Sequence, residues 1–323
     1  MSATNRTRRY ELHCHLDGSV RLETLTALAV EQDRALPAHP RRLAVAPADV
    51  GSLHAFLPYV DIAIDLLQTP QALQRVAAEL VEDWHHDDVV YGEVRFAPQL
   101  HTRAGLSIDD AIAAVGDGLA QGAAATGVHT GMLLCCLRHQ HPAVSMSVAD
   151  AAVRRRDIVA GLDLAGDERY PGAVHSEAFD LAHAAGLPVT VHAGEAAGPD
   201  SVWEALDVLG ARRIGHGVRS TAERALLDRL HRDQITLETC PRCNVLTRAV
   251  PTLADHPADR LLRAGLRVTV STDTRTTADT TLGQEFAALE ATFGWTAAEE
   301  QRCQDNAAHG AFNAPGPSQR SSF

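Results

Sequence analysis

The chain has 323 residues, 45% of them hydrophobic and 22% charged, with a formal net charge of −12. This length can bury a large core, and the composition excludes collagen-like, coiled-coil and wholly disordered proteins. The acidic balance gives no electrostatic basis for binding nucleic acid, and no apolar run approaches the roughly 20 residues of a membrane span. We therefore expect a small-molecule partner, with no nucleic acid and no membrane.

Short β-rich apolar runs alternate with helix-like segments along the chain. The eight predicted strands span 10–15, 89–96, 130–136, 158–163, 187–192, 213–216, 235–240 and 267–272. The helix-like segments between them include 71–86, 107–126, 173–185, 200–209, 220–232 and 256–264. Alternation of this kind requires a parallel sheet, and eight units without a linker between halves predict an α/β fold, a closed (β/α)8 TIM-type barrel.

The predicted barrel forms one domain over residues 1–312. The excess length lies largely between the first two strands, where 16–88 are expected to form a helical insertion. A doubly wound open sheet is the alternative, but no GxGxxG follows any predicted strand. The segment 313–323 is predicted to be a disordered tail.

The arginines and cysteines indicate the expected cellular compartment and exclude several kinds of catalysis. The basic N-terminus leads directly into the first predicted strand without an apolar h-region, which argues against a secretory signal. The six cysteines are therefore expected to be reduced thiols in the cytoplasm. All 29 basic residues are arginine. The absence of lysine excludes a Schiff base, a P-loop lysine and a metal bridge built on a modified lysine.

Polar side chains stand where several predicted strands end, which is where the active sites of barrels form. They are His13, His15, His192, Glu195, His216 and Asp273. His13 and His15 are two apart on a strand, so both imidazoles point to one face, as Zn²⁺ ligands would. A core histidine that only forms a hydrogen bond is the alternative for either one. The Leu16-Asp17-Gly18 turn brings a third polar side chain over the same mouth.

The second part of the pattern is His192-Ala193-Gly194-Glu195, with Asp273 at the end of the last strand. Three histidines and one aspartate would hold one zinc and leave room for water, which zinc activates at neutral pH. Glu195 would stand beside the metal as a proton carrier, or else cap the next helix. His216 could orient the attacking hydroxide, although a structural role is equally consistent with the sequence. This set predicts metal-assisted addition of water to an electrophilic carbon.

The residues resemble the adenosine deaminase family of amidohydrolase-type barrels. The similar stretches are ELHCHLDGS (11–19), YGEVRFAP (91–98), CCLRHQ (135–140), GLDLAGDE (161–168), HAGE (192–195), RIGHG (213–217), TCPRCN (239–244) and VSTD (270–273). The resemblance implies one Zn²⁺ per chain, bound by His13, His15, His192 and Asp273. It implies that Glu195 protonates a purine ring nitrogen, that His216 holds the hydroxide, and that His15, Asp17 and Gly166 contact a purine nucleoside. The implied reaction is hydrolytic deamination of adenosine, or of a close 6-aminopurine nucleoside, to the 6-oxo product and ammonia.

Two positions depart from the family pattern. Thr274 stands where a second aspartate usually binds the imidazole side of the purine, so binding could weaken or the preferred base could differ. Cys243 stands where serine is common and forms a CxxC with Cys240, for which we favour a structural role over a metal or redox role. A modified purine nucleoside, such as aminodeoxyfutalosine or a nucleoside of specialised metabolism, is therefore the alternative substrate.

Three other functions were weighed against this one. A cytidine-type zinc deaminase needs an HxE followed by PCxxC; His175-Ser176-Glu177 supplies the first, but Pro241 follows Cys240 instead of preceding it. A non-deaminating amidohydrolase could use the same zinc water, because barrels host many reactions. A catalytically silent binding protein is disfavoured because the whole ligand set and Glu195 are present.

Overall fold

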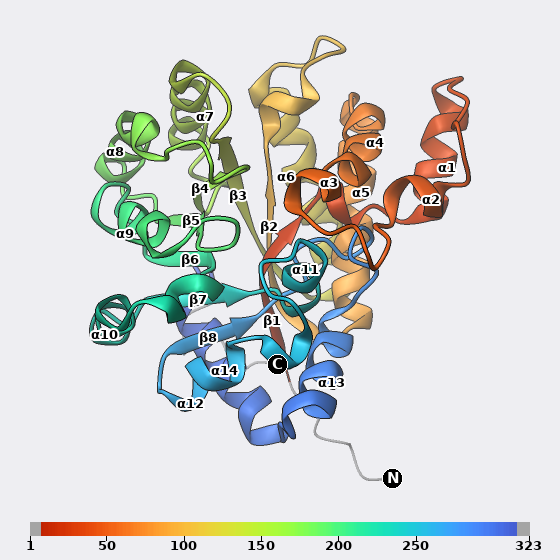
Figure 1. The fold of residues 1–323 in the computed structure, drawn as a ribbon. Helices are drawn as coiled ribbons and strands as arrows, with labels where there is room; N and C mark the ends of the chain where they lie inside the picture. Colours follow the sequence, from red (N-terminus) through yellow and green to blue (C-terminus); the bar gives the residue numbers. More distant parts are fainter. Residues whose placement is uncertain (1–7, 315–323) are drawn as a thin grey trace.

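The computed structural model describes residues 8–314 of the chain (Figure 1). Its eight strands are β1 (Arg9–His15), β2 (Val89–Phe96), β3 (His129–Leu137), β4 (Gly161–Ala165), β5 (Val189–Ala193), β6 (Arg213–His216), β7 (Thr236–Thr239) and β8 (Arg267–Val270). All neighbours pair in parallel and in chain order, which confirms the predicted (β/α)8 architecture. The strands are almost wholly buried, as expected for a sheet covered by an outer ring of helices.

The barrel closes between β8 and β1 through a single bridge, Cys14 with Asp273. The His15 amide donates to the Asp273 carbonyl at 2.6 Å, and the Asp273 amide donates to the His13 carbonyl at 2.8 Å. The seam is thus formed by the backbone of three residues that the sequence analysis placed in the metal site.

The helices cover the outside of the barrel. They are α1 (Leu22–Glu31), α2 (Pro40–Ala44), α3 (Leu53–Phe56), α4 (Pro58–Leu66), α5 (Pro70–His86), α6 (Ile108–Thr126), α7 (Pro142–Arg154), α8 (Ser176–Ala184), α9 (Pro199–Asp207), α10 (Arg224–Arg232), α11 (Pro241–Leu246), α12 (Ala258–Arg263), α13 (Leu282–Phe293) and α14 (Ala297–Gly310). Helix α5 shows why they dock: Thr69 caps it, Pro70 opens it, and its apolar face includes the fully buried Trp84. Trp84 lies so close to β2 that a Cβ on Gly92 would meet its ring at 2.5 Å.

The predicted helical insertion between the first two strands is confirmed. Helices α1 to α4 occupy it and lie together on one side of the barrel, in red and orange in Figure 1, while α5 is the regular barrel helix that returns to β2. Helix α4 contacts the short 3-10 helix 17–19 that follows β1, so the insertion reaches the C-terminal ends of the strands.

Some predicted boundaries were wrong by a few residues. The fourth strand was expected at 158–163 but spans Gly161–Ala165, because the amides of Ile158 and Val159 both bond the Arg155 carbonyl in a turn. Helices α7, α11, α13 and α14 were not among the expected segments.

The predicted tail 313–323 lies outside the described residues except for Asn313 and Ala314. The Asn313 amide donates to the Tyr91 hydroxyl at 3.0 Å. Within residues 8–314, none of the helices combines the length and the apolar character needed to cross a membrane.

Candidate active site

A cavity of about 330 Å³ opens at the C-terminal ends of the strands. Eight of the predicted site residues line it: His15, Asp17, Gly166, His192, Glu195, His216, Asp273 and Thr274. The ninth, His13, is fully buried and stacks edge-on to His192, with ring centroids 4.6 Å apart. The fold therefore brings together every residue that the sequence analysis selected.

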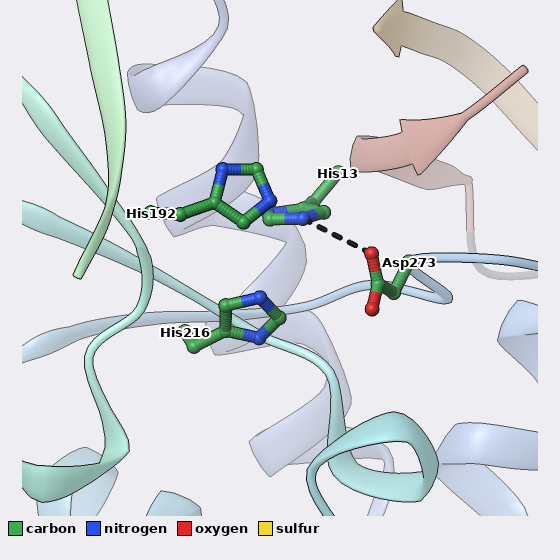
Figure 2. Close-up of side chains that lie close together, drawn as sticks. All are labelled: His13, His192, His216 and Asp273. Atoms are coloured by element: carbon green, nitrogen blue, oxygen red, sulfur yellow. Dashed lines mark ion pairs between the residues drawn. The ribbon is translucent and has the colours of Figure 1, made fainter. Parts of the chain in front are cut away.

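Four of these residues converge on one point. His13, His192, His216 and Asp273 each offer a ligand atom, and these atoms all lie within 4.8 Å of one another. Figure 2 shows the three imidazoles and the carboxylate turned toward the same space, with His13 Nε2 3.3 Å from Asp273 Oδ1. His13 Nε2 is buried and has no hydrogen-bond partner, as expected of a nitrogen that donates its lone pair to a cation.

His15, the remaining predicted ligand, adjoins this group. Its Nε2 lies 3.1 Å from His192 Nε2 and 3.4 Å from Asp273 Oδ1. Two ligand atoms about 2.05 Å from a tetrahedral zinc are separated by about 3.3 Å. The distances from His13 to Asp273, from His15 to Asp273 and from His15 to His192, 3.1–3.4 Å, match that separation, so this donor set fits a zinc ion.

Buried carboxylates hold the other nitrogen of two imidazoles. His13 Nδ1 lies 2.9 Å from Glu238 Oε2, and His192 Nδ1 lies 3.1 Å from Asp163 Oδ1. Arg95 joins the two carboxylates, with bonds of 2.7 Å to Glu238 and 3.0 Å to Asp163. Such outer contacts fix the tautomer and the orientation of metal-binding histidines. Sequence reasoning missed them, although buried charged residues on three strands were the available signal.

Burial and nearby charges determine the protonation states of His13 and of the carboxylates of Glu238 and Asp163. Burial, helped by the charge of Arg95, lowers the pKa of His13 to about 4, so its imidazole is neutral and able to bind a cation. Burial opposes ionisation of Glu238 and Asp163, but nearby positive charges outweigh it and lower both pKa values. These charges come from Arg95 and Arg213 at Glu238, and from His192 and Arg95 at Asp163.

Glu195 lies beside the converging imidazoles and is almost fully buried. Its Oε1 accepts the Thr247 hydroxyl at 2.8 Å, and its Oε2 lies 3.6 Å from His216 Nε2. Burial raises the pKa of the Glu195 carboxyl, although His216 partly offsets the effect. A carboxyl that holds a proton more readily than usual suits a general acid. The Asn244 side chain lies 3.0 Å from His216 Nδ1 and orients the ring.

The backbone is strained at two of these residues. His216 and Asp273 both have φ of +62°, a region that non-glycine residues rarely adopt and that costs about 1–3 kcal/mol. Hydrogen bonds across the barrel seam hold Asp273 in place, while Gly217, with φ of +66°, continues the turn after His216. The local strain points both side chains into the cavity.

The remaining predicted contacts surround the same space. Gly166 has φ of +94°, which favours glycine at this turn. The Thr274 side chain packs so tightly against Gly18 that a Cβ there would lie 2.2 Å from the Thr274 methyl group, and its buried hydroxyl has no hydrogen-bond partner. Burial raises the pKa of Asp17 to about 6.

The insertion supplies the other wall of the cavity. Phe56, Leu57, Val60 and Ile64 present apolar side chains from α3, α4 and the residue between them. Asp61 and Arg103 add charges, and the Arg103 guanidinium is paired with Asp65. None of these wall residues was selected from the sequence, because no motif marks them.

Two sequence features are structural. His175, from the candidate HxE, is buried away from the cavity and bonds the Ser145 hydroxyl at 2.9 Å and the Arg138 carbonyl at 3.2 Å. Cys240 and Cys243 are free thiols buried in an apolar cluster beneath the insertion, and burial raises the pKa of both.

Comparison with known proteins agrees with this geometry. Residues 9–320 match the family model described as adenosine deaminase. An adenosine deaminase of Mycobacteroides abscessus is 43% identical, over 93% of this chain and 89% of the relative, and one of Enterococcus faecalis is 39% identical, over 95% and 92%. An adenine deaminase of Arthrobacter aurescens has a similar structure, with a TM-score of 0.91, 27% identity and coverage of 98% of this chain and 96% of that one. A zinc-bound amidohydrolase of Burkholderia ambifaria has a TM-score of 0.88 and 25% identity, over 100% of this chain and 91% of that one. The chain belongs to the adenosine deaminase family.

Proposed function

We propose that this enzyme deaminates adenosine by hydrolysis, giving inosine and ammonia, with one Zn²⁺ per chain. The observation that carries the proposal is the juxtaposition of a buried carboxyl, Glu195, with a converging set of imidazoles and a carboxylate at one end of a single cavity. Relatives that are about 40% identical over most of the chain are adenosine deaminases, which supports the same base and sugar here.

We assign the zinc to His13, His15, His192 and Asp273. Ligand-to-ligand distances of 3.1–3.4 Å and the unpartnered His13 Nε2 support this set. When bound, zinc supplies a nucleophile at neutral pH by lowering the pKa of water. His216 also lies within the converging group, but its Nε2 faces Glu195, so we assign it to orienting the attacking oxygen.

The protein side chains then divide the remaining work. Glu195 holds a proton in a buried site and donates it to the ring nitrogen beside the attacked carbon, so that addition of the oxygen to this carbon and of the proton to this nitrogen together remove the double bond between them. His216 accepts a hydrogen bond from the incoming oxygen or donates one to it, and its orientation is fixed by Asn244. Thr274, with its free hydroxyl, and Gly166 hold the base, while Asp17 and His15 contact the sugar end.

The charges of the cavity support a nucleoside over its 5′-phosphate. Asp17 and Asp61 both line the cavity, and burial, together with the negative charge of Asp61, raises the pKa of Asp17. Arg103 is the one arginine among the described lining residues, and it is already paired with Asp65. A phosphate here would meet carboxylates without a free cation to offset them.

Ammonia release by purified, zinc-loaded protein tests the proposal. Adenosine, AMP, adenine and aminodeoxyfutalosine are compared at micromolar concentration, and zinc is counted per chain. We expect rapid release from adenosine and much slower release from AMP and adenine. Release only from a modified nucleoside would support the alternative substrate class, with Thr274 as the determinant. Zinc binding without release from any aminopurine would leave a non-deaminating amidohydrolase or a binding protein.

We also propose a cytoplasmic location. All six cysteines are buried free thiols in the structure, which fits a reducing compartment. Labelling of the purified native protein with a thiol reagent, before and after unfolding, would report whether they are reduced in the cell.

A further inference from the structure

Glu168 lies three residues beyond the end of β4, in the turn that follows Gly166, and its carboxylate is buried beside the site. Oε1 accepts the backbone amides of Glu195 at 2.8 Å and Ala196 at 2.7 Å. Oε2 accepts the amide of Gly194 at 2.7 Å and the Ser201 hydroxyl at 2.5 Å. Four donors on one carboxylate is the full capacity of the group.

These bonds define the path of the chain between β5 and α9. Residues 194–196 lie in neither element, so their amides have no partner within a strand or helix. Gly194 turns the chain with φ of +70°, and a Cβ there would lie 2.8 Å from Val202, so both the backbone conformation and the available space favour glycine at this turn. The Glu168 carboxylate is the common acceptor that fixes the three amides together, including that of Glu195 itself.

We propose that Glu168 is a positioning residue that holds Glu195 at the reacting atoms. The inference rests on the proposed function of Glu195 as the proton donor. Asp163, on β4 itself, bonds His192, so β4 and the loop after it supply the acceptors for both His192, on β5, and Glu195, just beyond β5. Glu168 does not line the cavity, and its hydrogen bonds go to the backbone of residues 194–196 and to the Ser201 hydroxyl, so it holds Glu195 through this loop.

The test variant is Glu168→Gln, which keeps the shape but places an NH₂ group against backbone donors. Because a misplacement of about 1 Å can cost about 100-fold in rate, we expect kcat for adenosine to fall about 100-fold. KM and zinc content should stay within about threefold of the wild type, since the ligands and the sugar contacts are untouched. Hydrogen exchange at residues 194–196 should become faster. Glu168→Asp, which keeps the charge, should recover part of kcat.

Glu204 offers a matched control. Its carboxylate accepts two backbone amides, Gly172 at 2.9 Å and Ala173 at 2.8 Å, in the loop before α8. Glu204→Gln removes the same kind of interaction from a loop that does not carry Glu195, and it also weakens the 3.5 Å pair with Arg138, which bonds the His192 carbonyl. We therefore expect kcat to fall by no more than about threefold and exchange at 194–196 to stay unchanged.

Several results would overturn the inference. One is an unchanged kcat in Glu168→Gln, and another is an equal loss in Glu204→Gln; a third is a loss of zinc that accounts for the loss of rate. If Glu168→Gln does not fold, Glu168→Asp decides, with at least a tenfold loss of kcat expected at normal zinc content. If the wild type does not deaminate adenosine, the proposed function fails, and exchange at residues 194–196 still decides whether Glu168 positions this segment.

Discussion

The two ends of the cavity are built in different ways. The proposed metal end consists of His13, His15, His192, His216 and Asp273, with Glu195 beside it. Buried side chains on β4 and β7, or just beyond β7, hold three of its imidazoles. The substrate wall consists of Thr274 and the apolar side chains of the insertion, with a buried hydroxyl that has no partner. The side chains of the metal end are thus held by hydrogen bonds to other buried side chains. The side chains of the substrate wall lie on loops and short helices. Substrate choice can therefore change without disturbing the chemistry.

The largest expected effect comes from the metal end. Glu195→Gln keeps the shape of the side chain and leaves every ligand in place, but the amide cannot deliver a proton. We expect zinc content near one per chain and a loss of kcat of about 10²–10⁴-fold, which steady-state ammonia release would measure. Thr247→Val is the control, since it removes the 2.8 Å bond to Glu195 and a 3.0 Å bond to the Cys243 carbonyl but leaves the Glu195 carboxyl, and it should cost far less. An unchanged kcat in Glu195→Gln would remove this residue from the mechanism.

The buried network of charged side chains that supports the metal end should contribute to stability. Glu238→Gln removes the negative charge that Arg95 and Arg213 share, and it leaves two buried cations short of a partner. Breaking a buried pair in this way costs about 3–5 kcal/mol of unfolding free energy, measurable by urea denaturation. Asp228→Asn, which removes the exposed pair with Arg224, should cost less than about 1 kcal/mol. Equal effects of the two variants would mean that the buried network is not a stabilising unit.

The free energy of unfolding should fall at low pH because of His101, which bonds the end of the insertion that forms the substrate wall. Burial lowers the pKa of His101 to about 4, and its Nδ1 lies 2.8 Å from the carbonyl of Leu67, just after α4. Between pH 6.5 and 4 the unfolded chain binds a proton at this histidine and the folded chain does not, so stability falls as the pH falls. The loss is up to about 1.4 kcal/mol per pH unit.

His101→Asn keeps a donor for the Leu67 carbonyl and removes the titrating group. Melting temperatures of the wild type and the variant, measured from pH 7.5 to 4.5, should therefore diverge as the pH falls, with the variant losing less. Parallel curves would show that His101 does not contribute to the acid response.

The smallest effect is expected at Thr274. Thr274→Asp places a carboxylate where the family usually has one and should lower KM for adenosine about tenfold. Thr274→Val keeps the shape and removes the hydroxyl, so KM should rise a few-fold while kcat changes little. Unchanged KM values in both variants would place the purine elsewhere in the cavity.

Much of this architecture was predictable from the chain itself. Alternating strands and helices imply the barrel, and because parallel strands end at one edge, residues as distant as His13 and Asp273 could be expected to meet. The boundary error at β4 arose because Ile158 and Val159 are β-branched, like strand residues, but lie in a turn.

The buried carboxylates that hold the imidazoles and the Glu195 loop could not be predicted in the same way. Asp163, Glu238 and Glu168 lie in different parts of the sequence, and no local motif says which imidazole or amide each one bonds. The bond from Asp163 to His192 depends on the register between neighbouring strands, the bond from Glu238 to His13 joins strands that are not neighbours, and the bonds of Glu168 depend on the path of a loop. The insertion was predictable as helical, but which of its side chains face the cavity depends on how it packs against the barrel.

The seam between β8 and β1 has a consequence for how the enzyme is made. Its single bridge joins residues 14 and 273, so it is the most distant strand pairing along the chain. Because the chain emerges from the ribosome from its N-terminus, His13 and His15 are exposed long before Asp273 exists. During synthesis, β1 must therefore remain unpaired on the side that later bonds to the end of β8. The site residues can all come together only after β8 has been made.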